Sequence, residues 1–300
     1  MQKITHQRKA YLLALLAVLI WSTMSSAFKI TLRFLDVDSL LFGAVINGII
    51  ILGIVGYISK RPLRFRQLSA KEYMSSALMG FFNPFLYYLV LFKAYDLLEA
   101  QEAGTLNYIW PIVLVFFSMI FLKQKIRWQA IVSIFISFGG ILIISTHGHP
   151  LGLHFSNRVG VALAVGSAIF WAAYWILNMK DKREDVGKIL LNLIFGLLYL
   201  VIYFIVIGKI PAFYSWQGIV GSLYIGIFEM SITFVVWLKA LNYSKNTAKV
   251  SNLIYLSPFL GLLWIHLTVG EEIHLYTFVG LTFIVGGIIL QRITEKRTAG

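Results

Sequence analysis

Ten apolar stretches, each long enough to cross a bilayer, constrain this 300-residue chain more than any other feature. A spanning helix needs about 20 residues. Runs of that length lie near residues 10–30, 38–58, 73–95, 100–121, 129–146, 159–179, 187–208, 216–238, 248–268 and 274–292. Of all residues 59% are hydrophobic and 13% are charged, whereas a soluble domain of this size needs a far more polar surface. The sequence therefore predicts an all-α integral membrane protein with ten transmembrane helices and short loops.

The net charge of +13 is distributed unevenly along the chain. With the amino terminus placed in the cytoplasm, most of the 26 Lys and Arg residues fall on the inner side, and the exceptions are Lys29, Arg33, Lys93, Arg158 and Lys209. Such an excess is the positive-inside rule and predicts that both termini are cytoplasmic. The charge thus needs no nucleic-acid partner. The expected partners are the bilayer and a small-molecule substrate.

An internal repeat relates the two halves of the chain. The stretch GFFNPFLYYLVLFKAY (80–95) matches GIFEMSITFVVWLKAL (226–241), with Gly80 aligned to Gly226. Further along, Pro111 aligns with Pro258, FGGILI (138–143) with VGGIIL (285–290), and Trp21 with Trp171. The sequence predicts two five-helix repeats, residues 1–146 and 159–300, joined by an outer linker at 147–158. Because five is odd, the second repeat is expected to be inverted in the membrane, with substrate bound at the repeat interface.

With these features the chain resembles the drug/metabolite transporter (DMT) superfamily, EamA family, over its whole length. Three stretches are more closely similar to aromatic amino acid exporters of the YddG type: IWSTM (20–24), EAGTLNYIWP (102–111) and IFWAAYWILNMK (169–180). The resemblance implies eight helices around a central cavity, with the fifth and tenth helices forming a scaffold or dimer-side pair. The chain departs from the family pattern at KQK (123–125), where a Gly-Glu pair is common, and at Glu229, where the aromatic exporters are expected to have an uncharged residue.

Glu229 is the strongest functional signal, because a carboxylate is costly near the middle of a membrane helix and usually faces a cavity or a partner. Its equivalent in the first repeat is Asn83, which precedes the helix-breaking Pro84. We expect Glu229 and Asn83 to face each other across the cavity, where one receives a substrate ammonium group or a proton. The alternative is a structural role in which Glu229 forms a cap or pairs with a lysine such as Lys29, Lys93 or Lys239.

Pro111 and Pro258 are each expected to delete one backbone hydrogen bond inside a helix. A freed carbonyl inside a bilayer is tolerated only where protein or cavity water satisfies it. Both kinks are therefore expected to line the pathway and to act as flexible joints. The residues ahead of them that are candidates for the cavity wall are Asn107, Tyr108, Asn252 and Tyr255.

Aromatic residues lie within the expected spans and not only at the interfaces, where an aromatic belt would collect them. Such rings can stack on a flat substrate and can hold a cation over their faces. Ordinary helix packing stays open as the role of each ring. The further candidates for the cavity wall are Trp21, Trp110, Trp171, Trp175, Tyr87 and Tyr88.

The remaining polar residues indicate no metal or cofactor. His147, His149 and His154 lie in the stretch THGHPLGLH, which is expected to be a solvated linker, not a metal site. Glu102 and its counterpart Lys249 are expected at the membrane interfaces, and a role in lining the mouth of the pathway stays open for the pair. The absence of cysteine excludes thiolate metal sites and disulfides.

The residue pattern favours a carrier over other classes of membrane protein. A zinc helix, a nucleophile with its base, or paired aspartates would indicate an enzyme, and rings of charge would indicate a channel. The expected function is transport of small metabolites, most of all aromatic or neutral amino acids, across the inner membrane by alternating access, and the family resemblance implies that the direction is export. A nucleotide-sugar or other carrier of the same superfamily is the alternative, and an intramembrane enzyme is a remote one. Protons are a further candidate partner, and both a monomer and a homodimer stay open.

Overall fold

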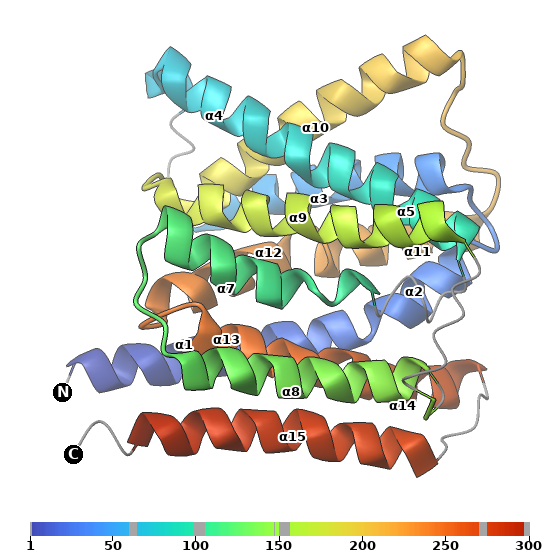
Figure 1. Ribbon diagram of the computed structural model, residues 1–300. Coiled ribbons are helices and arrows are strands. Elements are labelled where there is room, and N and C mark those ends of the chain that lie inside the picture. Colours follow the sequence, from blue (N-terminus) through green and yellow to red (C-terminus); the bar gives the residue numbers. More distant parts are fainter. Residues whose placement is uncertain are drawn as a thin grey trace.

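The computed structural model of the protein describes residues 2–59, 65–98, 106–146, 148–149, 157–269 and 275–296 (Figure 1). All regular structure in these ranges is helical. The first half contains α1 (Gln2–Ser22), α2 (Met24–Thr31), α3 (Val37–Ile58), η1 (Phe65–Gln67), α4 (Ala70–Gly80), the π-helical turn η2 (Phe81–Leu86), α5 (Tyr87–Leu97), α7 (Trp110–Phe121) and α8 (Trp128–Ser145). The second half contains α9 (Arg158–Lys180), α10 (Asp185–Ile207), α11 (Trp216–Phe228), α12 (Ile232–Tyr243), α13 (Ala248–Ser251), the 3₁₀ helix η3 (Asn252–Tyr255), α14 (Leu256–Val269) and α15 (Leu275–Lys296).

Six helical stretches in the described residues are long and apolar enough to cross a membrane, and they are His6–Phe28, Val37–Ile58, Ala70–Ala94, Arg158–Lys180, Asp185–Ile207 and Trp216–Tyr243. Three shorter apolar helices are Trp110–Phe121, Trp128–Ile143 and Phe278–Leu290. The expected run at 248–268 is interrupted, because α13 and η3 precede α14. The chain is therefore an all-α, multi-pass membrane protein. The number of ten spans and the orientation of the termini stay predictions.

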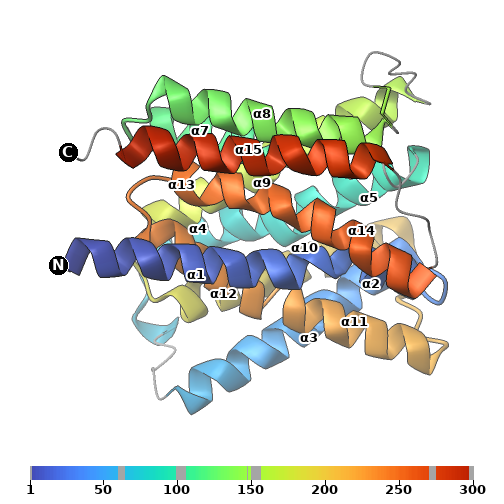
Figure 2. The same cartoon turned by 90° about the horizontal axis from the view of Figure 1, so that it is seen from below.

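The start of α1 and the end of α15 lie at the same end of the bundle (Figures 1 and 2). Along one edge, α8 and α15 run side by side in opposite directions, and the two views agree on this pairing. The side chain of Ser137 in α8 donates a hydrogen bond of 3.2 Å to the backbone oxygen of Ile284 in α15. The fifth and tenth expected helices thus form one packed pair.

Glycines permit the closest approaches between helices, and these approaches are reciprocal. A Cβ atom on Gly80 of α4 would lie 2.9 Å from the backbone nitrogen of Gly196 in α10. A Cβ atom on Gly226 of α11 would lie 3.0 Å from the backbone nitrogen of Gly48 in α3. Gly80 and Gly226 are equivalent in the sequence repeat, so equivalent positions make equivalent contacts. In the same way, Cβ atoms on Gly140 and Gly287 would collide with backbone atoms across the α8–α15 pair.

A buried polar network holds the hairpin formed by α9 and α10. The ammonium group of Lys188, of which 2% is exposed, donates to the backbone oxygens of Asn178 at 3.1 Å and Asp181 at 2.9 Å. It also lies 3.0 Å from the carboxylate of Asp185. Arg183 binds the Asp181 carboxylate and donates to Ser76 of α4 at 2.8 Å. Burial acts to raise the pKa of Asp181, but the bonds from Arg183 outweigh it and hold the pKa below its usual value.

Replacing Lys188 with methionine is expected to destabilise the protein by about 3 kcal/mol, because two buried carbonyls and the Asp185 carboxylate lose their partner. Breaking a buried ion pair costs about 3–5 kcal/mol. The lower value applies here, because the Asp185 side chain is 20% exposed. The thermal unfolding midpoint of the detergent-solubilised protein measures the effect. Lys182→Met is the matched control, because Lys182 is exposed on the same hairpin. Equal midpoints for the two variants would show that the network contributes little.

Candidate functional site

Helices are interrupted at Asn83 and at Glu229, two positions that the sequence repeat aligns with each other. In η2, Asn83 adopts an extended conformation (φ −153°, ψ 123°) between α4 and α5. At the equivalent place in the second half, residues 229–231 form a turn between α11 and α12. There the side chain of Ser231 donates to the backbone oxygen of Ile227 at 2.7 Å, and the side chain of Thr233 donates to that of Phe228. These hydroxyl groups satisfy carbonyls that the break leaves without helical partners.

Glu229 lies at this break and is buried, with 7% of the residue exposed. The hydroxyl group of Tyr88 in α5 donates a hydrogen bond of 2.7 Å to its Oε1 atom. The indole of Trp21 also lies next to the carboxylate, but outside hydrogen-bonding geometry. The Oε2 atom is buried and has no hydrogen-bond partner in the part of the chain that the structure describes. One oxygen of the carboxylate is therefore left to receive a hydrogen bond.

Asn83 was expected to face Glu229, and the structure places Tyr88 at hydrogen-bonding distance of the carboxylate. Asn83 is fully buried, and neither atom of its side-chain amide has a partner among the described residues. The following Pro84 packs against Gly196 of α10. A buried amide without partners is costly, which makes Asn83 a site where a ligand or water would be stabilised. Its pairing with Glu229 through a substrate stays a prediction.

Tyr87 begins a second polar chain, which crosses from α5 to α9. Its hydroxyl group donates to the Oδ1 atom of Asn107 at 3.3 Å. The amide nitrogen of Asn107 donates to Ser167 at 3.0 Å, and Ser167 donates to the backbone oxygen of Ala164 at 2.6 Å. The neighbouring rings of Tyr87 and Tyr88 lie 4.7 Å apart. Through these contacts, Tyr87 and Tyr88 connect α5 to the segment at Asn107, to α9 and to the break at Glu229.

Four buried tryptophans from four helices form what we call the tryptophan cluster: Trp21 of α1, Trp110 of α7, Trp171 of α9 and Trp237 of α12. The ring centroid of Trp21 lies 6.4 Å from Trp110, 6.0 Å from Trp171 and 5.6 Å from Trp237. Trp110 lies 6.0 Å from Trp171 and 5.7 Å from Trp237. These distances are typical of aromatic rings in contact.

The indole N–H groups of Trp21, Trp171 and Trp237 are buried without hydrogen-bond partners in the described chain. A tryptophan N–H is a donor only, and a buried donor usually finds an acceptor. Trp171 also packs against Tyr87, with the rings tilted and their centroids 4.5 Å apart. The arrangement offers one carboxylate for a cation, several flat faces, and donors for an anion.

Trp237 and Phe234 were absent from the sequence prediction. Phe234 is fully buried and lies 5.5 Å from Trp171 between ring centroids. A signal was present, because Trp237 follows Glu229 by two helical turns and so lies near the same helix face. Trp175, which the sequence did indicate, also contacts Trp171, at 5.5 Å.

The second kink lies away from the tryptophan cluster, and its expected place on the pathway stays a prediction. Tyr255 is buried against α8 and α15, where it contacts Phe138 with ring centroids 6.4 Å apart, and not against the tryptophan cluster. Asn252 is buried beside it at the start of η3, whereas Tyr108 packs between the two apolar clusters. The structure thus brings Trp21, Trp171, Tyr87, Tyr88 and Glu229 together and leaves Tyr255 at the scaffold pair.

Pro111 lies at the start of a helix, whereas Pro84 and Pro258 lie within helical stretches. Pro111 lies in the first turn of α7, and Pro258 is the third residue of α14. A proline in the first turn removes no helical hydrogen bond, because that N–H has no partner there. Pro111 therefore removes no hydrogen bond from α7. Pro258 follows α13 and η3 without a non-helical residue between them, and the expected loss of a hydrogen bond at Pro258 stays a prediction. The backbone is interrupted before them, by a turn at 108–109 and by η3.

Several expected residues lie outside the described residues, namely Glu102, His147 and His154. His149 is exposed. Within the described residues, no group of three or more His, Asp or Glu side chains could hold a metal ion. The groups that the structure brings together at the site are Glu229, amides and aromatic rings.

The chain as a whole is similar in sequence to known transporters. The sequence model of the EamA-like transporter family matches residues 8–146 and 158–292. An uncharacterized transporter of Clostridium kluyveri is 26% identical, with 97% of this chain and 95% of that protein covered. The uncharacterized transporter YvbV of Bacillus subtilis is also 26% identical, over 99% of this chain and 95% of its own length.

The aromatic amino acid exporter YddG of Escherichia coli is 22% identical to this chain, and the similarity covers 97% of this chain and 99% of the exporter. A solved crystal structure superposes with a TM-score of 0.80 at 19% identity, and covers 97% of this chain and 99% of the other. That likeness establishes a shared fold.

Proposed function

The chain belongs to the EamA-like transporter family, and from this premise we propose that it exports small zwitterionic metabolites across the inner membrane. The proposed substrates are aromatic or neutral amino acids, and the proposed mechanism is alternating access. The observation that carries the proposal is the buried Glu229 carboxylate, bound by Tyr88 and bordered by the tryptophan cluster. The partial similarity to an aromatic amino acid exporter supports the same substrate class.

An amino acid has three features that the site can complement. Its ammonium group can bind the free oxygen of Glu229, since a buried carboxylate favours a cationic partner. Its carboxylate can accept from buried donors that have no partner in the described chain, such as the Trp171 indole and the Asn83 amide. An aromatic side chain can stack among the tryptophans. Each of these contacts gives a partner to a buried polar group, which stabilises the bound substrate.

The rings of the tryptophan cluster touch one another, so a substrate can enter between them only when the helices separate. The breaks at η2, at 229–231 and at η3 are joints at which such movement costs little. The reciprocal glycine contacts support two inverted repeats, 1–146 and 159–300, that move against each other about the site.

Overproduction of the protein in bacterial cells is expected to give resistance to toxic analogues of phenylalanine and tryptophan. Cells preloaded with radiolabelled phenylalanine are expected to lose label faster than cells with an empty vector. A panel with neutral, acidic and basic amino acids defines the substrate class. Exchange of a radiolabelled nucleotide sugar in proteoliposomes, with amino acids left unmoved, would overturn the proposal in favour of the other carrier type.

A further inference from the structure

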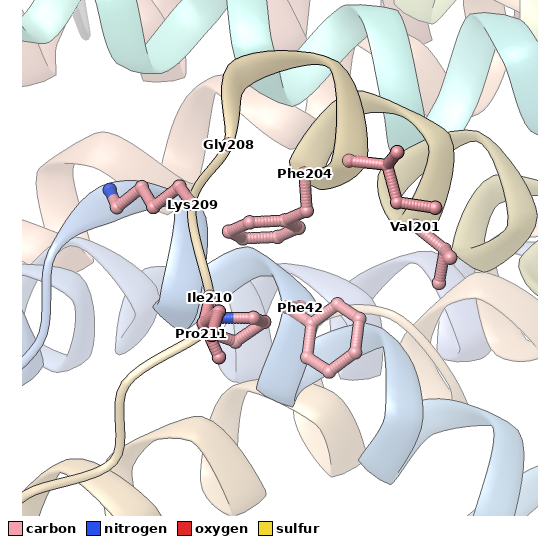
Figure 3. A pocket seen from close by; sticks show the side chains of 8 residues that line it. Phe42, Val201, Phe204, Gly208, Lys209, Ile210 and Pro211 are labelled. Atoms are coloured by element: carbon pink, nitrogen blue, oxygen red, sulfur yellow. The ribbon is translucent and has the colours of Figure 1, made fainter.

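A groove lies between the start of α3 and the end of α10, at the end of the bundle opposite the start of α1 (Figures 1 and 3). Its volume is about 390 Å³, which falls within the range of cavities that hold small molecules. The wall is apolar and is formed by Phe42, Val201, Phe204, Ile205, Ile210 and Pro211. The one charged side chain at the groove is Lys209. The groove therefore fits a long apolar group with a polar end.

The residues around the groove are typical of a protein surface that faces lipid near the membrane boundary. Ile205 is 74% exposed and Ile210 is 84% exposed. Tyr214 and Trp216 follow closely and are also exposed, and these residue types gather where the bilayer meets water. A groove among such residues is typical of the membrane boundary, where an apolar wall can face acyl chains and a lysine can contact lipid head groups.

Lys209 is part of a charged cluster with two carboxylates. Its ammonium group lies 3.0 Å from the Oδ1 atom of Asp36 and 2.8 Å from the Oδ2 atom of Asp38. Asp36 also caps α3 by accepting from the backbone nitrogen of Ser39 at 3.0 Å. The hydrogen bond from Lys209 to Asp38 raises the pKa of Lys209, and the bond to Asp36 adds to it. Burial acts to raise the pKa of Asp36, but bonds from Ser39 and Lys209 hold it below its usual value.

With one cation and two anions, the cluster carries an excess negative charge beside an apolar groove. We propose that this groove binds one acyl chain of a zwitterionic phospholipid with a primary ammonium head group. The lipid phosphate approaches Lys209, and the lipid ammonium shares the carboxylates of Asp36 and Asp38. An anionic lipid lacks the ammonium and is repelled by the excess carboxylate. A quaternary ammonium group cannot donate hydrogen bonds to the carboxylates.

Such a lipid would hold together the two elements that form the groove. Residues 208–211 connect α10 to the segment before α11, and the backbone nitrogen of Ala212 already donates to Ser39 at 2.9 Å. Lys209 and this bond tie that segment to the start of α3. The lipid site is thus a property of the membrane-facing surface and does not depend on the transported substrate.

The test uses the full-length protein reconstituted in nanodiscs with equal amounts of phosphatidylethanolamine and phosphatidylglycerol. After exchange into detergent, retained lipid is identified by native mass spectrometry. Phosphatidylethanolamine is expected to be enriched over phosphatidylglycerol by up to about fivefold, because an exposed ion pair contributes up to about 1 kcal/mol. Asp38→Asn is expected to remove this preference while one lipid is still retained.

Val201→Trp fills the groove and is expected to abolish lipid retention. Ile202→Trp is the matched control, because the neighbouring Ile202 is 49% exposed on α10 and is not part of the groove wall. Both variants must elute as a single species in size-exclusion chromatography. Retained lipid with the composition of the mixture, or equal retention by the two tryptophan variants, would overturn the proposal.

Discussion

Replacing Glu229 with glutamine is expected to lower the initial rate of amino acid efflux at least about tenfold, because hydrogen bonds to a charged group contribute about 1.5–3 kcal/mol. Glutamine keeps the size of the side chain and can still accept from Tyr88, but it has no charge for a substrate ammonium or for proton exchange. The measurement is efflux of labelled phenylalanine from vesicles, normalised to the amount of protein.

Tyr88→Phe is the graded control for this prediction. It removes the hydroxyl group that donates to Glu229 at 2.7 Å and leaves the carboxylate in place. The expected loss is smaller, about three- to tenfold, because the carboxylate keeps its charge for the substrate and loses only one hydrogen-bond donor. Both variants should keep the thermal unfolding midpoint of the wild type within a few degrees. Wild-type efflux by Glu229→Gln would remove this residue from the mechanism.

A proton role can be separated from an ammonium role with the same variant. If Glu229 exchanges a proton for substrate, the variant still binds phenylalanine but no longer responds to a pH gradient across the vesicle. If Glu229 binds the ammonium group, binding itself is lost. Equilibrium binding and gradient-driven efflux, measured on one preparation, therefore assign the function of the carboxylate.

Glu229 could be found from the sequence because a charge inside an apolar run stands out against the cost of burying it. Its partner could not be found in the same way, since the repeat aligns Glu229 with Asn83 and gives no information on Tyr88. Trp237 was missed for a related reason, because its position in the first repeat is the aliphatic Leu91. The sequence repeat identifies equivalent positions, but it does not predict contacts made by residues that differ between the two halves.

The helix boundaries show a second limit. The sequence indicated proline as the cause of each kink, whereas the break at 229–231 contains no proline and depends on hydroxyl groups of Ser231 and Thr233. A serine or threonine inside an apolar run can bond to a helical carbonyl or to a neighbouring helix, and the sequence does not distinguish these. Tertiary contacts decide which one forms.

Glycine spacing, by contrast, could be predicted from the sequence, since FGGILI and VGGIIL mark the α8–α15 pair. Gly140→Leu and Gly287→Leu are each expected to destabilise the protein by more than about 3 kcal/mol, above the usual cost of overpacking, because the clash is with backbone atoms. A Cβ atom on Gly287 would lie 2.6 Å from the backbone oxygen of Ser133, and one on Gly140 would collide with that of Gly280. The unfolding midpoint and the yield of monodisperse protein measure the loss.

The neighbouring glycines supply matched controls on the same two helices. Cβ atoms on Gly139 and Gly286 would meet nothing within 4 Å. Gly139→Leu and Gly286→Leu should therefore be neutral or stabilising, since leucine has the higher helix propensity by up to about 1 kcal/mol. Because Gly140 and Gly287 share one interface, their double variant should cost less than the two single losses combined. Equal loss from adjacent glycines would mean that the reciprocal contact is not formed, and the inverted-repeat proposal would lose its main structural support.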